Sequence, residues 1–148
     1  NTLTVNLHLM MVSFYRPTSK KYKIVIEADA FPSDIYAVES QIKYHRLDCK
    51  ESLLKLTPRP GESVIRTEDI LEIIKKEGDN IALIMLGGVN YYTGQVFDFK
   101  SITESAHNKE IIVGFDLDNS FGFFDSRVKS FSIFLSINVF SRFFFFSA

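Results

Sequence analysis

The sequence predicts an α/β fold of three layers, in which a mainly parallel sheet carries helices on both faces. Three short apolar runs, rich in Val, Ile and Leu, predict the strands: residues 22–27, 81–86 and 111–117. Such runs are typical of strands that are buried on both faces. Helical patterns separate these runs, and an alternation of strand and helix is typical of parallel βαβ units.

The segments between these strands carry start and stop signals. Apolar residues spaced three and four apart predict a helix over residues 2–15, which Pro17 ends. The sequence Pro32-Ser33-Asp34 predicts the start of a second helix, which extends to about His45. Further along we expect a short strand at residues 53–56, a helix from Thr67 as its cap to Gly78 as its stop, and a weaker helix over residues 98–108.

Three places in this pattern are candidates for a binding site. Asp116 lies at the end of the run 111–117, where open α/β sheets bind their ligands. Phe31 follows one strand and precedes a helix, so its ring either stacks on a planar ligand or packs in the core. Thr4 and Asn6 lie at the start of the first helix and form either an anion site or an ordinary helix cap.

Composition excludes several classes of function. The 148 residues are 46% hydrophobic, which suffices for one domain or for part of a larger one. A net charge of −1 gives no indication of a nucleic-acid surface or a polybasic membrane anchor. The single cysteine, Cys49, excludes an internal disulfide and is expected to be a half-buried thiol in a reducing compartment. The chain opens at Asn1 directly on an apolar run, so we expect an excerpt of a longer protein.

The last part of the chain differs from the rest. After Leu117 it is rich in Phe and Ser, and four consecutive Phe residues stand at 143–146, near its end. Residues 130–141 carry no charge but are too few to span a bilayer as a helix, and residues 131–140 have the pattern of an aggregation-prone strand. We therefore expect a partial domain over residues 1–117 and an atypical tail over residues 118–148. This tail is expected either to pair as a substitute strand beside residues 111–117 or to make the chain insoluble.

Four motifs together resemble one enzyme family. They are LTVNLH at residues 3–8, FPSD at 31–34, YYTGQ at 91–95 and GFDL at 114–117. In this order they resemble the large, cofactor-binding domain of the kynureninases. These are fold-type-I pyridoxal-phosphate enzymes of the aspartate-aminotransferase-like group. The combination disfavours another fold-type-I enzyme.

The resemblance implies roles for particular residues. Leu3 and Thr4 match the pair that holds the phosphate of the cofactor. Phe31 matches the aromatic residue that stacks on the pyridine ring, and Pro32, Ser33 and Asp34 complete that wall. Asp116 matches the acid that pairs with the pyridine nitrogen, where a carboxylate keeps the nitrogen protonated and the ring able to accept electrons.

The sequence also departs from the family pattern at several positions. Gly87 stands where such enzymes have Ser, and Asn119 stands where they have a titratable His. The Schiff-base lysine of the family lies beyond GFDL, and the only lysine after Asp116 is Lys129, in surroundings that do not resemble the family's site. No catalytic residue is therefore assigned. No metal site is expected either.

The resemblance also implies an activity. Kynureninase hydrolyses L-kynurenine to anthranilate and L-alanine, or 3-hydroxykynurenine to 3-hydroxyanthranilate and L-alanine, in tryptophan catabolism and NAD biosynthesis. It implies a cytoplasmic homodimer that binds a small-molecule substrate and neither nucleic acid nor membrane. The sequence predicts a truncated form that is inactive alone. The alternative is a non-catalytic fragment that associates with a full-length subunit or with another protein.

Overall fold

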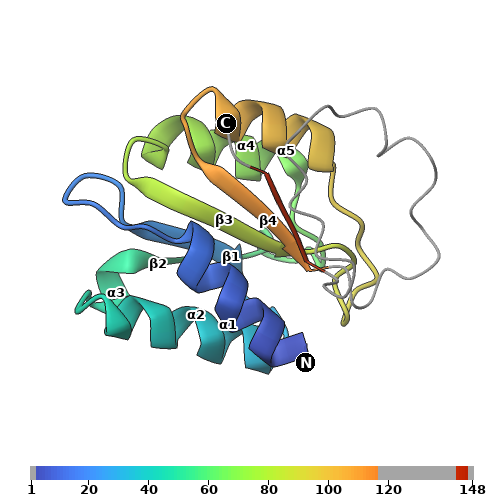
Figure 1. Ribbon diagram of the computed structural model, residues 1–148. Helices are drawn as coiled ribbons and strands as arrows, with labels where there is room; N and C mark the ends of the chain where they lie inside the picture. Colours follow the sequence, from blue (N-terminus) through green and yellow to red (C-terminus); the bar gives the residue numbers. More distant parts are fainter. Residues whose placement is uncertain (1–2, 117–142, 147–148) are drawn as a thin grey trace.

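The computed structural model describes residues 3–116, with side chains from Val5 onward, and the backbone of residues 143–146. Its sheet has the strand order β2-β1-β3-β4-β5 (Figure 1). The first four strands in the chain are parallel, and β5 is antiparallel to β4. The strands are β1 (Lys23–Glu27), β2 (Leu53–Leu56), β3 (Ile81–Gly87), β4 (Ile112–Asp116) and β5 (Phe143–Phe146). The expectation of a mainly parallel sheet is confirmed.

Helices cover both faces of this sheet (Figure 1). One face carries α1 (Leu3–Phe14), α2 (Pro32–Tyr44) and the short α3 (Cys49–Ser52), and the other carries α4 (Thr67–Glu77) and α5 (Phe99–His107). Among the residues whose side chains are described, two separate clusters of buried apolar side chains result, one on each side of the sheet. The strands β1 and β4 are buried at every position after their first residue, as the continuous apolar runs predicted. The three-layer arrangement is therefore confirmed.

Two local features differ from expectation. Thr67, predicted as the cap of α4, is instead its first helical residue, and the N-cap is Arg66. This prediction was wrong because Arg66 already has an extended backbone and the acidic side chains of the first turn favour the helix start without a side-chain cap. The short α3 was not predicted. It forms because the Asp48 side chain accepts a hydrogen bond from the Lys50 N–H.

Strand order determines where a ligand site belongs. From β1 the chain passes to β2 on one side of β1 and then returns to β3 on the other side. The crevice between β1 and β3 is therefore a topological switch point, where open α/β sheets bind their ligands at the carboxyl ends of the strands. The strands β1, β3 and β4 end at Glu27, Gly87 and Asp116, respectively.

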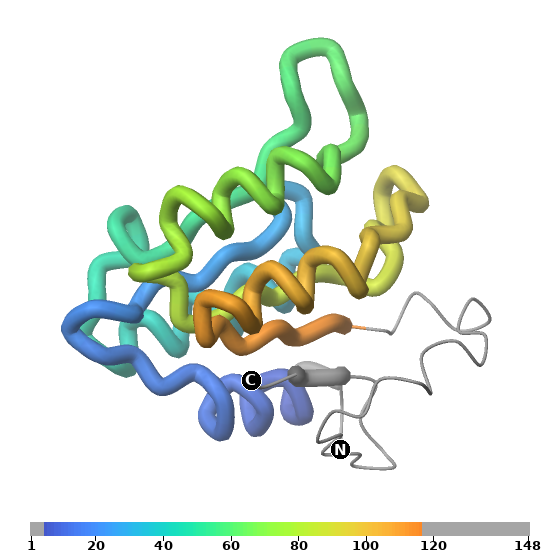
Figure 2. The backbone as a smooth tube through the Cα atoms, turned by 90° about the horizontal axis from the view of Figure 1, so that it is seen from above, coloured from blue at the N-terminus to red at the C-terminus, as the bar shows by residue number. Residues whose placement is uncertain are grey.

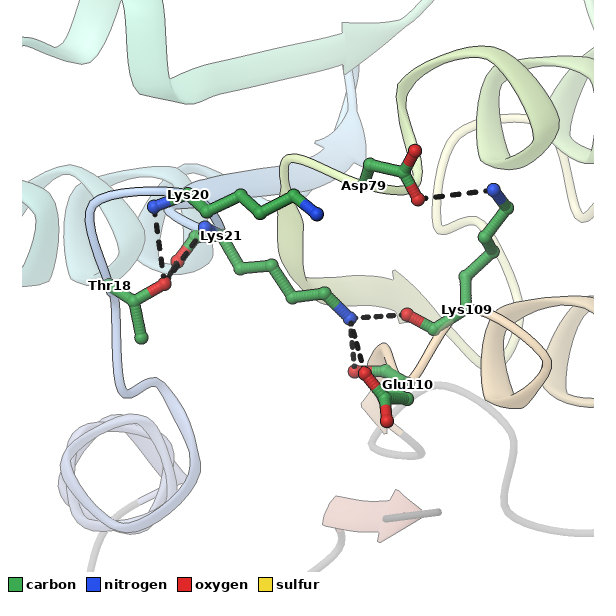
Figure 3. Close-up of polar contacts among 6 residues, drawn as sticks. All are labelled: Thr18, Lys20, Lys21, Asp79, Lys109 and Glu110. Carbon is green, nitrogen blue, oxygen red and sulfur yellow. Dashed lines mark hydrogen bonds and ion pairs between the residues drawn. The ribbon is translucent and has the colours of Figure 1, made fainter.

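The amino-terminal end of the sheet is closed by polar contacts (Figure 3). The Lys21 Nζ donates hydrogen bonds to the carbonyl oxygens of Lys109 and Glu110, which lie between α5 and β4. The Lys109 ammonium in turn pairs with Asp79, just before β3, at 3.1 Å. These contacts connect the loops that precede β1, β3 and β4. They therefore stabilise the amino-terminal end of the sheet.

The tail supplies β5, which extends the sheet beside β4. Phe143 lies opposite Asp116 in the register, and Phe146 lies opposite Val113. The expectation that the tail pairs as a substitute strand is confirmed for residues 143–146. The predicted strand at 131–140, Asn119 and Lys129 lie outside the described residues. In the part of the chain that the structure describes, no helix is long and apolar enough to cross a bilayer.

Candidate functional site

A small hollow, open to solvent, lies at the carboxyl ends of the parallel strands. It is the place that the switch point between β1 and β3 predicts. Three strand ends, two loops and the first turn of α2 supply its lining residues, which are Glu27, Ala30, Phe31, Asp34, Gly87, Val89, Asn90, Tyr91 and Asp116.

Phe31 forms one wall of this hollow. It is the N-cap of α2, since Pro32 occupies the first helical position and Phe31 keeps an extended ψ of 136°. The ring is 50% exposed, so the alternative of a core residue is wrong. It lies edge-to-face with Tyr91, with 5.4 Å between ring centroids and 76° between ring planes. The two rings form a half-open aromatic surface.

Asp116 lies at the end of β4 and is only 7% exposed. It is the register partner of Gly87 at the end of β3. Its main-chain carbonyl accepts a hydrogen bond from the Gly88 N–H, which joins the end of β4 to the turn after β3. The sheet therefore fixes the backbone of Asp116 beside the hollow that this residue lines.

The remaining FPSD residues lie in the first turn of α2. Asp34 is buried and lines the hollow, and its Oδ1 accepts a hydrogen bond from the Ser33 hydroxyl at 3.2 Å. Pro32 and Ser33 adjoin the hollow in sequence and are not among its lining residues. The structure thus brings Phe31, Asp34 and Asp116 together around one space.

Leu3 and Thr4 form the start of α1. Figures 1 and 2 both show that α1 begins on the side of the sheet where the parallel strands end. A helix start presents free main-chain N–H groups, which favour an anion. The side chains of Leu3 and Thr4 lie outside the described residues.

Sequence reasoning missed Glu27, which ends β1 and is only 2% exposed. Its carboxylate accepts hydrogen bonds from the Gly87 N–H and from the Asn90 side-chain amide. Burial raises the pKa of Glu27 above its ordinary value, the acids Asp34 and Asp29 add to the rise, and the two hydrogen bonds oppose it. The signal was present, because Glu27 ends its strand as Asp116 does.

Gly87 is explained by the same contact. A Cβ atom at this position would lie 3.2 Å from the Glu27 Oε1, which is closer than most real contacts of this kind. Absence of a side chain therefore leaves room for the carboxylate to reach the Gly87 N–H.

No metal centre is evident in the described part of the chain, where no group of three or more His, Cys, Asp or Glu side chains lies suitably placed. Cys49 is partly buried, as expected, and its thiol contacts the Glu39 carbonyl. The hollow offers an aromatic surface and carboxylates to a ligand.

Comparison with known proteins decides the family relationship. No family model matches the chain. Curated proteins named kynureninase do match: that of Myxococcus xanthus is 60% identical over 82% of this chain, and that of Homo sapiens is 55% identical over 82%. That of Koribacter versatilis is 55% identical over 90%. This stretch of chain is homologous to kynureninases.

The homology has a limited span. This chain covers 29%, 26% and 31% of the Myxococcus, human and Koribacter kynureninases, which is less than a third of each. The resemblance read from LTVNLH, FPSD, YYTGQ and GFDL is nevertheless confirmed, because the kynureninase matches extend over most of this chain.

Solved structures confirm the fold. The apo cysteine desulfurase of Thermococcus onnurineus matches 77% of this chain with a TM-score of 0.58 and 12% identity, and 32% of that enzyme is covered. The ureidoglycine-glyoxylate aminotransferase of Bacillus subtilis matches 76% of this chain with a TM-score of 0.55 and 17% identity, and 26% of it is covered. At these identities the likeness concerns the fold alone, and it agrees with the expected fold-type-I architecture.

Proposed function

We propose that this chain forms part of the pyridoxal-phosphate site of a kynureninase. In the complete enzyme this site serves the hydrolysis of L-kynurenine or 3-hydroxykynurenine to anthranilate or 3-hydroxyanthranilate and L-alanine. The observation that most supports the proposal is that half-exposed Phe31 and buried Asp116 line one hollow at the switch point. The shared name of the relatives supports the choice of enzyme.

The residues of the hollow fit a flat, positively charged aromatic ring. Phe31 and Tyr91 offer aromatic surface, and Asp116 offers a carboxylate that is largely withdrawn from water. Because the helix start at Leu3 and Thr4 favours an anion, it suits the phosphate of the same molecule. A planar cation with an attached phosphate has the chemistry of pyridoxal phosphate.

Each residue then has a definite task. When bound, pyridoxal phosphate supplies an electron sink for bond cleavage at the substrate carbon. Asp116 would hold a proton on the ring nitrogen, and Phe31 would orient the ring and exclude water from one side of it. The main-chain N–H groups at the start of α1 would hold the phosphate.

We further propose that this chain is not catalytic by itself. None of the residues carried over from the family moves the substrate's α-proton, and the only lysine after Asp116 is Lys129. The test is anthranilate formation from L-kynurenine by the purified chain in the presence of pyridoxal phosphate. We expect no turnover above a mixture without protein, and turnover well above that background would overturn this part of the proposal.

One observation favours the alternative, in which the chain associates with a full-length subunit. Helix α1 buries Leu7 and Met11 but exposes Val5, Leu9 and Val12, so it presents an apolar stripe to solvent. Size-exclusion chromatography of the chain with and without full-length kynureninase tests whether the two proteins associate. Dimerisation and a cytoplasmic location remain predictions of the resemblance.

A further inference from the structure

Glu27 holds together two segments that are far apart in the sequence. Its carboxylate lies at the end of β1 and is almost completely buried. One oxygen accepts a hydrogen bond from the Gly87 N–H at 2.6 Å, and the other accepts one from the Asn90 Nδ2. A carboxylate is the one protein group of this length that accepts on both oxygens, so it suits a position with two facing donors.

Asn90 passes this constraint to the loop that follows β3. Its Oδ1 accepts hydrogen bonds from the main-chain N–H groups of Tyr92 and Thr93, at 3.1 and 2.9 Å, and from the Thr93 hydroxyl at 3.0 Å. Its main-chain carbonyl accepts from the Gly94 N–H. The buried Asn90 side chain thus holds the turn through its Oδ1 atom. Glu27 in turn holds the Asn90 side chain by accepting a hydrogen bond from its Nδ2 atom.

The turn carries Tyr91, the aromatic partner of Phe31. Both rings are about half exposed, so burial alone does not fix where they lie. Phe31 comes from the loop after β1 and Tyr91 from the loop after β3, and Glu27 is the buried group that links the ends of these two strands. Positions of exposed rings are reproducible only when the backbone beneath them is held.

We propose that Glu27 is a positioning residue that sets the aromatic wall of the hollow. Through Asn90 it holds the turn at Tyr91 against the FPSD loop at Phe31, so that the wall exists before a ring binds. The ligand-binding part of this inference rests on the proposed cofactor site. The ordering of the turn does not.

The polarity of the Glu27–Asn90 contact provides a sharp test. In Glu27→Gln the amide has one acceptor oxygen for two donors, so its NH₂ group faces either the Asn90 NH₂ group or the Gly87 N–H, and in Asn90→Asp two carboxylates face each other. In the double variant Glu27→Gln/Asn90→Asp the introduced glutamine donates to the introduced aspartate. That aspartate still has an oxygen to accept from Tyr92 and Thr93, so the pairing is restored with its direction reversed. Glu77→Gln, at the opposite end of the sheet in an ion pair with Lys23, is the matched control.

The first measurement is amide hydrogen exchange of the full chain without ligand. We expect each single variant to accelerate exchange over residues 91–95 by about tenfold or more, since a buried polar contact is lost. The double variant should return to within about threefold of the original rate, and Glu77→Gln should not change it. Unchanged exchange in the single variants, or a double variant no better than the worse single one, would overturn the inference.

The second measurement is the dissociation constant for pyridoxal phosphate. We expect it to rise about tenfold in each single variant and to recover in the double variant, in parallel with the exchange rates. If exchange follows this pattern while affinity stays constant in every variant, Glu27 orders the loop but does not position a ligand wall, and the inference is overturned. If the original chain binds no pyridoxal phosphate, the proposed function fails, whereas the exchange data still test the contact.

Discussion

The main-chain carbonyl oxygen of Asp116 accepts a hydrogen bond from the N–H of Gly88, one residue beyond the end of β3. This contact closes the carboxyl end of the β3–β4 pair and fixes the backbone from which the Asp116 side chain extends. The side chain of Asp116 therefore starts from a backbone position that does not depend on a ligand. It is therefore suited to a role that depends on position, such as pairing with a ring nitrogen.

Replacing Asp116 by Asn is expected to weaken binding of pyridoxal phosphate. A hydrogen bond between charged groups contributes roughly 1.5–3 kcal/mol, so the dissociation constant should rise about tenfold to hundredfold. Fluorescence or absorption titration measures it. Asp79→Asn, which changes an exposed acid at the opposite end of the sheet, is the matched control. Equal or tighter binding by the Asp116 variant would count against the assigned role, because removing a negative charge alone favours an anionic ligand.

Replacing Phe31 by Ala is expected to lower affinity for pyridoxal phosphate with little effect on folding. A ring contact contributes about 0.5–1.5 kcal/mol beyond area burial, which corresponds to roughly twofold to tenfold in affinity. The free energy of unfolding should change little, since half of the ring is exposed. Tyr92→Ala is the control, because Tyr92 is 79% exposed in the same region and is not among the lining residues. Similar losses of affinity in both variants would show that the Phe31 ring does not contact the ligand specifically.

Tyr15 is expected to make stability depend on alkaline pH. Burial raises the pKa of its hydroxyl from 10.0 to about 12, with a smaller contribution from Cys49. This hydroxyl donates a hydrogen bond to the Tyr22 carbonyl at 2.7 Å. Because the folded pKa is the higher one, the stabilisation is fully present below about pH 10 and is lost as the pH rises through about 12.

Denaturant unfolding between pH 9 and pH 12 provides the measurement for Tyr15. We expect the free energy of unfolding to fall more steeply over about pH 10–12 in the original chain than in Tyr15→Phe, which has no hydroxyl to titrate. Every other side chain is the same in the two proteins, so its effect cancels in the comparison. Parallel curves would contradict the assignment.

Proline substitutions test whether β5 pairs with β4 in solution. Successive N–H groups of a strand point in opposite directions, so only one of Phe144 and Phe145 directs its N–H toward β4. Proline removes that donor, whereas at an outward-facing edge position proline is tolerated. One of Phe144→Pro and Phe145→Pro should therefore accelerate hydrogen exchange in β4, and the other should leave it unchanged. Equal behaviour of the two variants would argue against the pairing.

The fold could be predicted from the sequence because its signals are local. The runs that became β3 and β4 are apolar at nearly every position, and the Pro32-Ser33-Asp34 start of α2 is fixed by helix geometry. The carboxyl-edge position of Asp116 followed from the same pattern. The sequence pattern alone did not decide whether Phe31 is a core residue or a ligand contact. The resemblance to the kynureninases favoured the ligand contact.

Other features of the candidate site could not be predicted, because they depend on contacts between residues that are far apart in the sequence. Glu27 and Asn90 are 63 positions apart, and their pairing follows from β1 and β3 lying side by side in the sheet. Gly87 was noted only as a departure from the family's Ser, whereas its short distance to the Glu27 carboxylate appears only in the structure. The cap of α4 was misplaced by one residue because an extended Arg66 precedes Thr67 without a side-chain cap.

The most direct test is a titration of the full chain with pyridoxal phosphate, followed by borohydride reduction and mass spectrometry of the peptides. We predict saturable binding that Phe31→Ala and Asp116→Asn weaken, without one dominantly modified lysine. Absence of saturable binding would contradict the account. So would fixation mainly on a single lysine such as Lys129, because this would give the chain the covalent site that we propose it lacks.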